Sequence, residues 1–586
     1  MKQHIETLMQ AAIKSLQDQG ILPSHDLPDY RIESPKDKEH GDFAVNAALV
    51  FAKLIKQSPQ EMALHLQRAL PSSDHIAQVT IAGPGFINFY LTATALHSII
   101  PEILAAGKNF GRSDEGNNQV INLEFVSSNP TGPLHVGHGR TAAFGDVCGN
   151  LLAAMGYQVH REYYINDAGR QMDILALSIW LRYLEVMGES FHFPTNGYQG
   201  DYVKEIAIQL RQQHQDSFYQ PIARVYTQIP ADEPEGGNKE THIDALIDRC
   251  RLLLGDSVYR LILKFGLNII LADIQDDLAE FGVQFDEWFP ESQLYETGVV
   301  DRCLKQLQDK GLTYEQEGHI WFKATAFGDE KDRVLVRKNG VPTYFCADIA
   351  NHIGKIERGA VRMINVLGSD HHGYVARIKA ALAAFDITQD KLTTLLVQFV
   401  VLYRNNEKQS MSTRSGEFIT LRALRREVGN DAARFFYLMR KADQHVEFDL
   451  ELATRKSNEN PVYYLQYAYA RICSVMRQVQ ERNMQYDQNL GLANLNLLIE
   501  SAEKDCIYQL ASYPDLLKVA ALRYDPQLLV NYLRELANAF HSYYNAHQFL
   551  VDHEPTRQAR LCLVNAIRQI MANGLELLGL SAPEVM

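Results

Sequence analysis

Two histidines, His135 and His138, have a type and spacing in this 586-residue chain that suggest chemistry at once. They lie in the stretch Ser-Asn-Pro-Thr-Gly-Pro-Leu-His-Val-Gly-His-Gly, residues 128–139. Residues three apart on a helix project to the same side, and Gly137 between them has no Cβ, so a flat ring can lie against the backbone. The N-terminus of a helix also offers free N–H groups and a positive dipole to a phosphate. The stretch therefore predicts a turn that binds a nucleotide.

The elements around this turn predict how it is positioned. Residues 120–126 form a short apolar run typical of a buried strand, and residues 140–155 have the pattern of a helix with one small and apolar face. Strand, tight turn and helix make the first unit of a nucleotide-binding α/β sheet, which binds ligands beyond the carboxyl ends of its strands. Residues 361–367 and 395–402 are predicted as further buried strands of that sheet.

A second group of polar residues follows a predicted hairpin. Asn339-Gly340 between two apolar runs favours a type I′ turn. If a helix begins near Thr343, Tyr344 and Asp348 face the same direction. Glu124 adds a carboxylate at the opposite wall of the predicted pocket, and carboxylates are the best partners of a guanidinium group. The other interpretation of Glu124 is a buried strand carboxylate paired with a structural arginine.

Charge and composition restrict the possible partners. The net charge is −14, which argues against indiscriminate nucleic-acid binding. Residues 403–441 nevertheless contain nine basic and four acidic residues, which predicts either a patch for a nucleic-acid backbone or a solvated helical face. Seven cysteines without a Cys-x-x-Cys pair fit a reducing cytoplasm. No apolar run is long enough to span a bilayer, so we expect no membrane.

The motifs together resemble a known family. His-Val-Gly-His looks like the HIGH signature of class I aminoacyl-tRNA synthetases, and the longer string Glu-Phe-Val-Ser-Ser-Asn-Pro-Thr-Gly-Pro-Leu, residues 124–134, resembles arginyl-tRNA synthetases. Residues 408–416, Lys-Gln-Ser-Met-Ser-Thr-Arg-Ser-Gly, resemble the mobile KMSKS loop. Ser410 and Thr413 stand where the family has lysines. Lys408 and Arg414 are the nearby cations that would take the place of those lysines.

The resemblance implies a role for individual residues. The catalytic residues would be His135, His138, Lys408 and Arg414. Arginine would be bound by Glu124, Ser127, Asn129, Tyr344 and Asp348, with Asp370 as a further contact. ATP would be bound by Ser128, Asn129, Pro130, Thr131, Gly132, Pro133, Leu134, His135, Val136, Gly137, His138, Gly368, Met411 and Ser412. Mg²⁺ is implied by ATP chemistry, but we predict no protein metal site, because adjacent residues such as Asp370, His371 and His372 diverge on a helix.

The predicted fold is multidomain α/β. Residues 1–115 would form an α+β domain that contacts tRNA, and residues 116–455 a Rossmann-type catalytic domain with a parallel sheet. Residues 185–300 look like an insertion that either closes over tRNA or simply packs. Residues 456–586 would form an all-α anticodon-binding domain, in which most tyrosines are core and an exposed minority stacks on unpaired bases.

The implied activity is that of an arginine–tRNA ligase. ATP would activate L-arginine to arginyl-adenylate with release of pyrophosphate, and arginine would then pass to the 2′-hydroxyl of the terminal adenosine of tRNA(Arg). We expect a cytoplasmic monomer. Two alternatives stay open: a non-catalytic tRNA-binding relative, suggested by the altered lysine pattern at 410–413, and a different nucleotidyltransferase with a HIGH-type turn.

Overall fold

The centre of the computed structural model is a five-stranded parallel sheet with the order β12-β11-β5-β6-β7. The structure describes residues 1–586 except 26, 34, 36 and 410–418. The strands are β5 (Val120–Phe125), β6 (Gln158–Ile165), β7 (Glu287–Pro290), β11 (Arg362–Gly368) and β12 (Leu392–Val397). The strand order reverses between β5 and β11, and ligands bind at such a switch point. The Rossmann-type sheet that the sequence predicts is confirmed.

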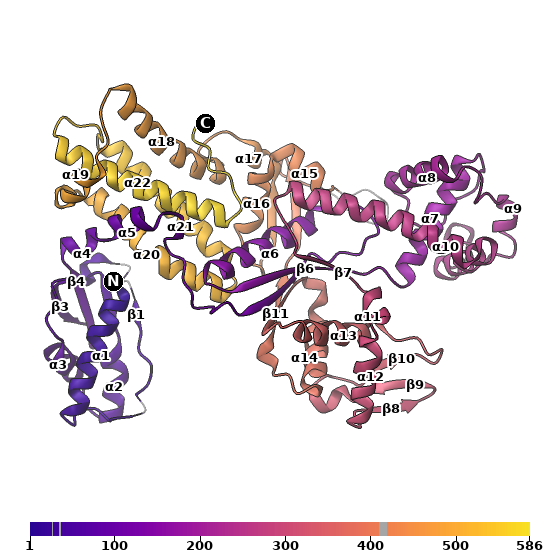
Figure 1. Ribbon diagram of the computed structural model, residues 1–586, viewed down its shortest axis with the longest axis horizontal. Helices are drawn as coiled ribbons and strands as arrows, with labels where there is room; N and C mark the ends of the chain where they lie inside the picture. Colours follow the sequence, from indigo (N-terminus) through magenta and orange to yellow (C-terminus); the bar gives the residue numbers. More distant parts are fainter. Residues whose placement is uncertain (26, 34, 36, 410–418) are drawn as a thin grey trace.

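Helix α6 (Val136–Ala154) follows β5 and crosses the middle of the molecule (Figure 1). It differs from the predicted helix because it is buried almost all round rather than on one face. The sheet covers one side, and α16 (Asn430–Leu438), α20 (Ser501–Arg523) and α21 (Pro526–Ala546) cover the other. A helix enclosed in this way needs apolar and small residues on every face.

The strand predicted over residues 395–402 is wrong. Strand β12 ends at Val397, and β13 (Val400–Arg404) belongs to a separate sheet with β14 (Glu407–Lys408) and β15 (Val446–Asp449). Between the two strands, the Gln398 N–H donates to the Ala442 carbonyl at 2.8 Å and redirects the chain. The sequence shows no sign of this break, because both strands are mainly apolar and are mainly buried or half-buried.

The type I′ turn predicted at Asn339-Gly340 is also wrong, although the chain does reverse there. The N–H of Gly340 donates to the Arg337 carbonyl at 2.8 Å, and Gly340 has φ +77° whereas Asn339 keeps a negative φ. A type I′ turn needs positive φ at both central residues. Helix α13 (Tyr344–Glu357) begins directly after the reversal, as predicted.

The N-terminal module is a four-stranded antiparallel sheet flanked by helices at one end of the molecule (Figure 1). Its elements are α1 (Lys2–Asp18), β1 (Ile32–Glu33), β2 (Phe43–Val45), α2 (Ala47–Ile55), α3 (Pro59–Ala69), β3 (Ile76–Ala82) and β4 (Phe86–Leu91). Strands β3 and β4 form an antiparallel hairpin. Asp42 precedes β2, and its carboxylate accepts the Leu91 N–H at 2.6 Å.

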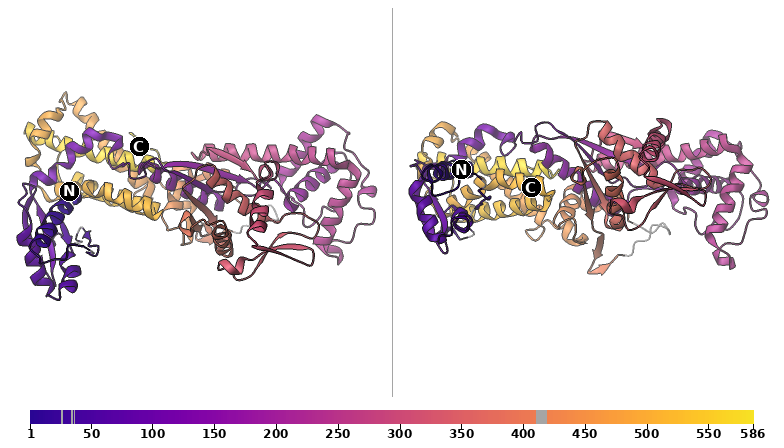
Figure 2. Two further views of the ribbon diagram at one scale, coloured as in Figure 1. Left: turned by 60° about the horizontal axis from the view of Figure 1, so that its bottom comes forward. Right: turned by 90° about the horizontal axis from the view of Figure 1, so that it is seen from below.

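The insertion projects from the sheet to the opposite end of the molecule (Figures 1 and 2). Helix α7 (Arg170–Val186) leads into it, and it contains α8 (Asp201–His214), α9 (Ile222–Val225) and the long α10 (Lys239–Glu280), which bends at Gly255. The chain then returns to the sheet as β7, which lies inside the segment 185–300. After it come α11 (Ser292–Glu296), α12 (Val299–Asp309), β8 (Thr313–Gln316), β9 (His319–Phe322), β10 (Arg333–Val336), α13 and α14 (His372–Ala384).

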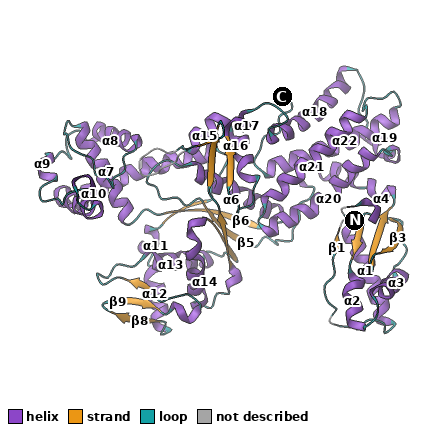
Figure 3. Ribbon diagram, turned by 180° about the vertical axis from the view of Figure 1, so that it is seen from behind, coloured by secondary structure: helices purple, strands orange, loops and turns teal. Residues whose placement is uncertain are grey.

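The C-terminal module is helical throughout, as predicted (Figure 3). Helices α15 (Leu421–Val428), α16 and α17 (Leu450–Thr454) lead into α18 (Pro461–Glu481), α19 (Gln488–Ala493), α20, α21 and α22 (Glu554–Leu577). Short helices α4 (Ala93–His97) and α5 (Ile99–Ala106), which follow the N-terminal module, pack on α20 and α22. None of the helices in the described part of the chain combines the length and apolar character needed to cross a membrane.

Candidate active site

The two histidines of the 128–139 stretch lie against each other where α6 begins. Their rings stack with centroids 3.6 Å apart and planes 20° apart. His135 is the N-cap residue, and its Nδ1 accepts the N–H groups of Gly137 at 3.0 Å and His138 at 3.4 Å. A Cβ on Gly137 would lie 2.9 Å from the His135 ring, so the flat ring that requires this glycine is the histidine itself.

Both rings are neutral at pH 7. Burial lowers the pKa of His135, and burial together with the His135 ring lowers the pKa of His138 well below its ordinary value. Nδ1 of His138 accepts the His135 N–H at 3.3 Å. Since Nδ1 is the acceptor in each neutral ring, the ring proton lies on Nε2. The pair is therefore suited to donate hydrogen bonds to a phosphate rather than to carry positive charge.

The turn pairs with the chain just beyond residues 410–418. The Leu421 N–H donates to the Leu134 carbonyl at 2.8 Å, and the Val136 N–H donates to Ile419 at 3.2 Å. The candidate residues Met411, Ser412 and Arg414 lie outside the described residues. Lys408 precedes that segment and is exposed on β14. Residues 134–136 and 419–421, almost 300 residues apart in the sequence, thus adjoin in space.

Strand β5 ends in an unusual backbone conformation. Val126 and Ser127 both have positive φ, +66° and +40°, which is rare for residues other than glycine and costly for a β-branched one. The bend brings the Ser127 hydroxyl to the N–H of Tyr164, which donates to it at 3.1 Å. Ser128 binds the Tyr163 hydroxyl at 2.8 Å, and Asn129 is exposed beside them.

Carboxylates from three elements lie close enough for their charges to interact. The pKa of Asp348 on α13 is raised to about 8, first by burial and then by the negative charges of Glu291 and Glu124. The pKa of Glu291 is raised to about 7, by burial and by Asp167. The Tyr374 hydroxyl donates to Asp348. The Arg377 guanidinium lowers the pKa of Asp348 by less than burial and the two acids raise it, so the negative charge of this cluster is only partly balanced.

Glu124 differs from the other two acids because it has a cationic partner. Lys355, fully buried on α13, pairs with Glu124 and with Glu162 of β6 at 3.2 Å. Glu162 also accepts Arg358 at 2.6 Å and the Asn122 amide at 3.0 Å. The structural partner of Glu124 is therefore a lysine rather than the arginine considered from the sequence.

Tyr344 closes the pocket from the side. Its hydroxyl lies against Gly169, where an added Cβ would be 2.0 Å away, and 45% of its surface is exposed. Gly368 ends β11 at the same edge of the sheet as β5. Asp370 is exposed, with His371 as a neighbour at 3.7 Å. The structure thus groups Glu124, Ser127, Tyr344 and Asp348 and leaves Asp370 at the rim.

Sequence reasoning missed Glu291, Lys355 and Tyr374. Lys355 had a weak signal, because it lies two helical turns after Asp348 on the same helix. Glu291 had none, since it follows β7 at the end of a long insertion. The Asp167 carboxylate accepts the Ser292 N–H at 2.9 Å and the Ser292 hydroxyl at 2.6 Å. It therefore holds the segment that carries Glu291.

Some of the cations in the basic segment 403–441 pair inside the protein, which leaves both the nucleic-acid patch and the solvated helical face open. Arg434 is buried against Asp146, and Arg425 is buried against Asp277. Arg422 binds Asp273, Asp276 and Glu280, and Arg404 binds Glu427. Arg422, Arg425 and Arg434 thus form internal ion pairs, whereas Arg404, Lys408, Arg426, Arg440 and Lys441 are exposed.

The C-terminal helices carry a half-buried aromatic cluster. Tyr463 and Tyr467 of α18 stack with centroids 6.0 Å apart, and the Arg471 guanidinium lies 4.6 Å from the ring centroids of both Tyr467 and Tyr544. Tyr532 and Tyr543 are core residues, as expected for most of the tyrosines. Stacked rings with an adjacent guanidinium suit unpaired bases.

Among the described residues, one group has the spacing of metal ligands: His160, Glu162 and Glu287. Arg358 lies 2.6 Å from Glu162 and 3.9 Å from Glu287, and Lys355 also binds Glu162. Two cations already balance these acids, so the group does not fit Mg²⁺. We therefore assign no protein ligand to that ion.

Comparisons with known proteins agree with this geometry. The family model for the catalytic domain of class I (R) tRNA synthetases matches residues 99–454, that for the arginyl tRNA synthetase N-terminal domain matches 3–91, and that for the DALR anticodon-binding domain matches 465–586. The parallel sheet, the HIGH-type turn and the helical C-terminal module therefore define a class I aminoacyl-tRNA synthetase.

Full-length relatives give the particular family. The chain is 52% identical to the arginine–tRNA ligases of Thioalkalivibrio sulfidiphilus and Legionella pneumophila strain Paris, with both chains fully covered in each case. The arginyl-tRNA synthetase structure from Thermus thermophilus shares the fold, with a TM-score of 0.74 and 23% identity over 99% of this chain and 100% of that one. The chain belongs to the arginyl-tRNA synthetase family.

Proposed function

We propose that this protein joins L-arginine to tRNA(Arg) in two steps. An oxygen of the arginine carboxylate attacks the α-phosphorus of ATP, the bond to the β-phosphate oxygen breaks, and pyrophosphate leaves. The 2′-hydroxyl of the terminal adenosine of the tRNA then attacks the arginyl carbonyl, and AMP leaves. The observation that carries the proposal is a cluster of carboxylates with raised pKa values, Asp348 and Glu291, next to Glu124 of the strand that leads into the HIGH-type turn.

The carboxylates supply the specificity for arginine. Guanidinium is planar and always charged, and it pairs with carboxylates through forked donors. Asp348 and Glu291 would receive its charge, and Tyr344 would close over it. Glu124, Ser127 and Asn129 lie at the other wall, where the α-ammonium and carboxylate of the amino acid would bind, with Asp370 as an outer contact. Lysine has a single ammonium and cannot satisfy several carboxylates in one plane.

ATP would lie along residues 128–138 and Gly368. His135 and His138 would donate from Nε2 to the phosphates, and the N-terminus of α6 would add its N–H groups. Lys408 and Arg414, together with Met411 and Ser412, are the proposed contacts from the cationic loop. The contribution of all these groups is alignment and charge stabilisation. Mg²⁺ would supply further charge neutralisation on the phosphates.

The flanking modules would hold the tRNA. We propose that residues 1–115 contact its outer corner and that the helical module 456–586, with its half-buried aromatic cluster, contacts the anticodon. The protein would act as a cytoplasmic monomer. A non-catalytic relative or a different nucleotidyltransferase is not favoured, because 52% identity to ligases extends over the full length.

The test is arginine-dependent exchange of labelled pyrophosphate into ATP, with and without bulk tRNA. We expect exchange with arginine but not with lysine or citrulline, because a site built on hydrogen bonds rejects analogues that lack the donors by about 10⁴-fold. Asp348→Asn is expected to abolish exchange at ordinary arginine concentrations. Well-folded protein that binds tRNA but gives no exchange would contradict the proposal and favour the non-catalytic relative.

A further inference from the structure

The insertion touches the nucleotide turn through one residue of α8. The Tyr202 hydroxyl donates to the Thr131 carbonyl at 2.6 Å. The Tyr202 ring covers Gly132, where an added Cβ would lie 2.9 Å from the ring. Tyr202 therefore fixes the turn both by a hydrogen bond and by contact, although 71 residues separate the two along the chain.

The insertion also holds the other side of the turn, through α10. Arg422 of α15 binds Asp273 and Asp276 at 3.0 Å and Glu280 at 3.1 Å. Directly before it, the Leu421 N–H donates to the Leu134 carbonyl. The acids of α10 thus hold the segment that pairs with the nucleotide turn.

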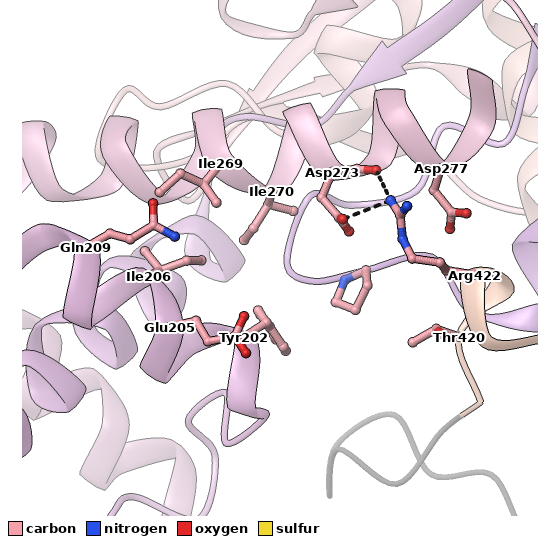
Figure 4. Close-up of a pocket in the computed structure, with 11 residues that line it drawn as sticks. Tyr202, Glu205, Ile206, Gln209, Ile269, Ile270, Asp273, Asp277, Thr420 and Arg422 are labelled. Atoms are coloured by element: carbon pink, nitrogen blue, oxygen red, sulfur yellow. Dashed lines mark hydrogen bonds and ion pairs between the residues drawn. The ribbon is translucent and has the colours of Figure 1, made fainter. Parts of the chain in front are cut away.

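The two contacts form opposite walls of one pocket. The pocket has a volume of about 270 Å³ and is lined by Tyr202 and Ile206 from α8, by Ile270 and Asp273 from α10, and by Pro133 and Arg422. Figure 4 shows the Arg422 guanidinium bound to Asp273 of α10 at one side of the pocket, with Tyr202 of α8 at another side. The insertion therefore packs around the nucleotide turn from two directions.

We infer that the insertion positions the ATP-binding turn, with Tyr202 as the positioning residue on one side and Arg422 on the other. The inference rests on the proposed ATP site at residues 128–138. It assigns the insertion a part in the ATP step that does not require tRNA. The sequence left open whether the insertion closes over tRNA or simply packs.

Tyr202→Phe tests the inference because it removes one hydroxyl and keeps the ring. The matched control is Tyr226→Phe, since the Tyr226 hydroxyl also donates to a carbonyl within the insertion, that of His192 at 3.0 Å. Loss of one neutral hydrogen bond predicts a rise of about 3- to 10-fold in the KM for ATP for Tyr202→Phe. The KM for arginine should stay unchanged in both variants, and Tyr226→Phe should leave both KM values unchanged.

Arg422→Gln tests the second contact, with Arg404→Gln as its control because Arg404 forms an exposed pair with Glu427. The KM for ATP should rise for Arg422→Gln and stay unchanged for Arg404→Gln. Equal effects in a variant and its control, or an equal rise in the KM for arginine, would overturn the inference. Calorimetry of ATP binding to the full chain repeats the comparison without turnover. A wild-type protein that gives no exchange would count against the proposed function. The calorimetric comparison of the variants with their controls would still decide the inference.

Discussion

Lys355 is a buried cation between two carboxylates of neighbouring strands, and one of them is the proposed arginine ligand Glu124. It lies on the helix that also carries Tyr344 and Asp348. The single ammonium therefore holds Glu124 in an ion pair and fixes its position relative to the helix that carries Asp348. Without it, Glu162 would keep its ion pair with Arg358, and Glu124 would lose its ion pair with Lys355.

Lys355→Met is expected to lower the free energy of unfolding by about 3–5 kcal/mol, because it breaks a buried ion pair. It should also raise the KM for arginine by at least about 10-fold, equivalent to about 1.4 kcal/mol, with little change in the KM for ATP. Chemical denaturation and exchange kinetics measure the two effects.

The double variant Lys355→Met with Glu162→Gln separates stability from function. It removes one of the two acids that Lys355 pairs with, so part of the stability should return while the KM for arginine stays high. An unchanged KM for arginine in the single variant would show that Glu124 does not depend on Lys355.

The raised pKa values of Asp348, about 8, and Glu291, about 7, predict how arginine binding depends on pH. The folded free protein holds protons that the unfolded chain releases near pH 4, so these groups make the free protein less stable as pH rises from about 4 to 8. Arginine binds the ionised carboxylates and reverses this loss. The rise in Tm on adding arginine should therefore be larger at about pH 8.5 than at about pH 6. An equal rise at both values would contradict the assignment, and Asp348→Asn should reduce the difference.

At the scale of elements, the loop after β6 shapes the pocket by its contact with α13. Gly169 has φ +89° and leaves room for the Tyr344 hydroxyl. The sequence of neither element predicts this contact by itself, because the contact joins residues 169 and 344.

Gly169→Ala is expected to displace Tyr344 and to raise the KM for arginine by about 10-fold or more, since tight packing near a reacting group is sensitive to small shifts. Gly188→Ala is the matched control, because Gly188 has φ +102° with open space around it. Both variants bear the cost of a positive φ, about 1 kcal/mol. Equal arginine KM values in the two variants would argue against a role for the Tyr344 contact.

At the scale of the whole molecule, Arg434 joins three modules of an elongated protein (Figure 2). Its guanidinium pairs with Asp146 of α6 and donates to two carbonyls. One belongs to Phe281, the C-cap residue of α10 of the insertion, and the other to Leu578, the C-cap residue of α22. Gly579 leaves room for it, since an added Cβ would lie 2.3 Å away. The catalytic sheet, the insertion and the C-terminal helices therefore share one buried charge.

Arg434→Met should leave Asp146 buried without its cation and reduce the free energy of unfolding by about 3–5 kcal/mol. The modules should also unfold less cooperatively, which differential scanning calorimetry would detect as a broadened or divided transition. Arg426→Met, on the exposed face of α15, is the control and should change little. A sharp wild-type transition in the Arg434 variant would contradict this role.

Local patterns in the sequence determined much of this protein. Apolar runs bounded by glycine and proline predicted β5, β11 and the helical tail, and the short HIGH-type turn predicted the start of α6, because these features depend on residues close in sequence. The family resemblance named Glu124, Ser127, Tyr344 and Asp348, which the structure brings to one pocket. The break between β12 and β13 was not predictable, because it depends on a hydrogen bond between Gln398 and Ala442.

Only the tertiary structure decided which charges remain available. Composition left open a nucleic-acid patch or a solvated helical face over 403–441, and the structure shows that Arg422, Arg425 and Arg434 form ion pairs with α10 and α6. The structure likewise pairs Lys355 with Glu124, whereas the pKa values of Asp348 and Glu291 are raised. An ion pair between residues more than 100 positions apart leaves no trace in local periodicity, since its energy depends on distance and burial that folding alone creates.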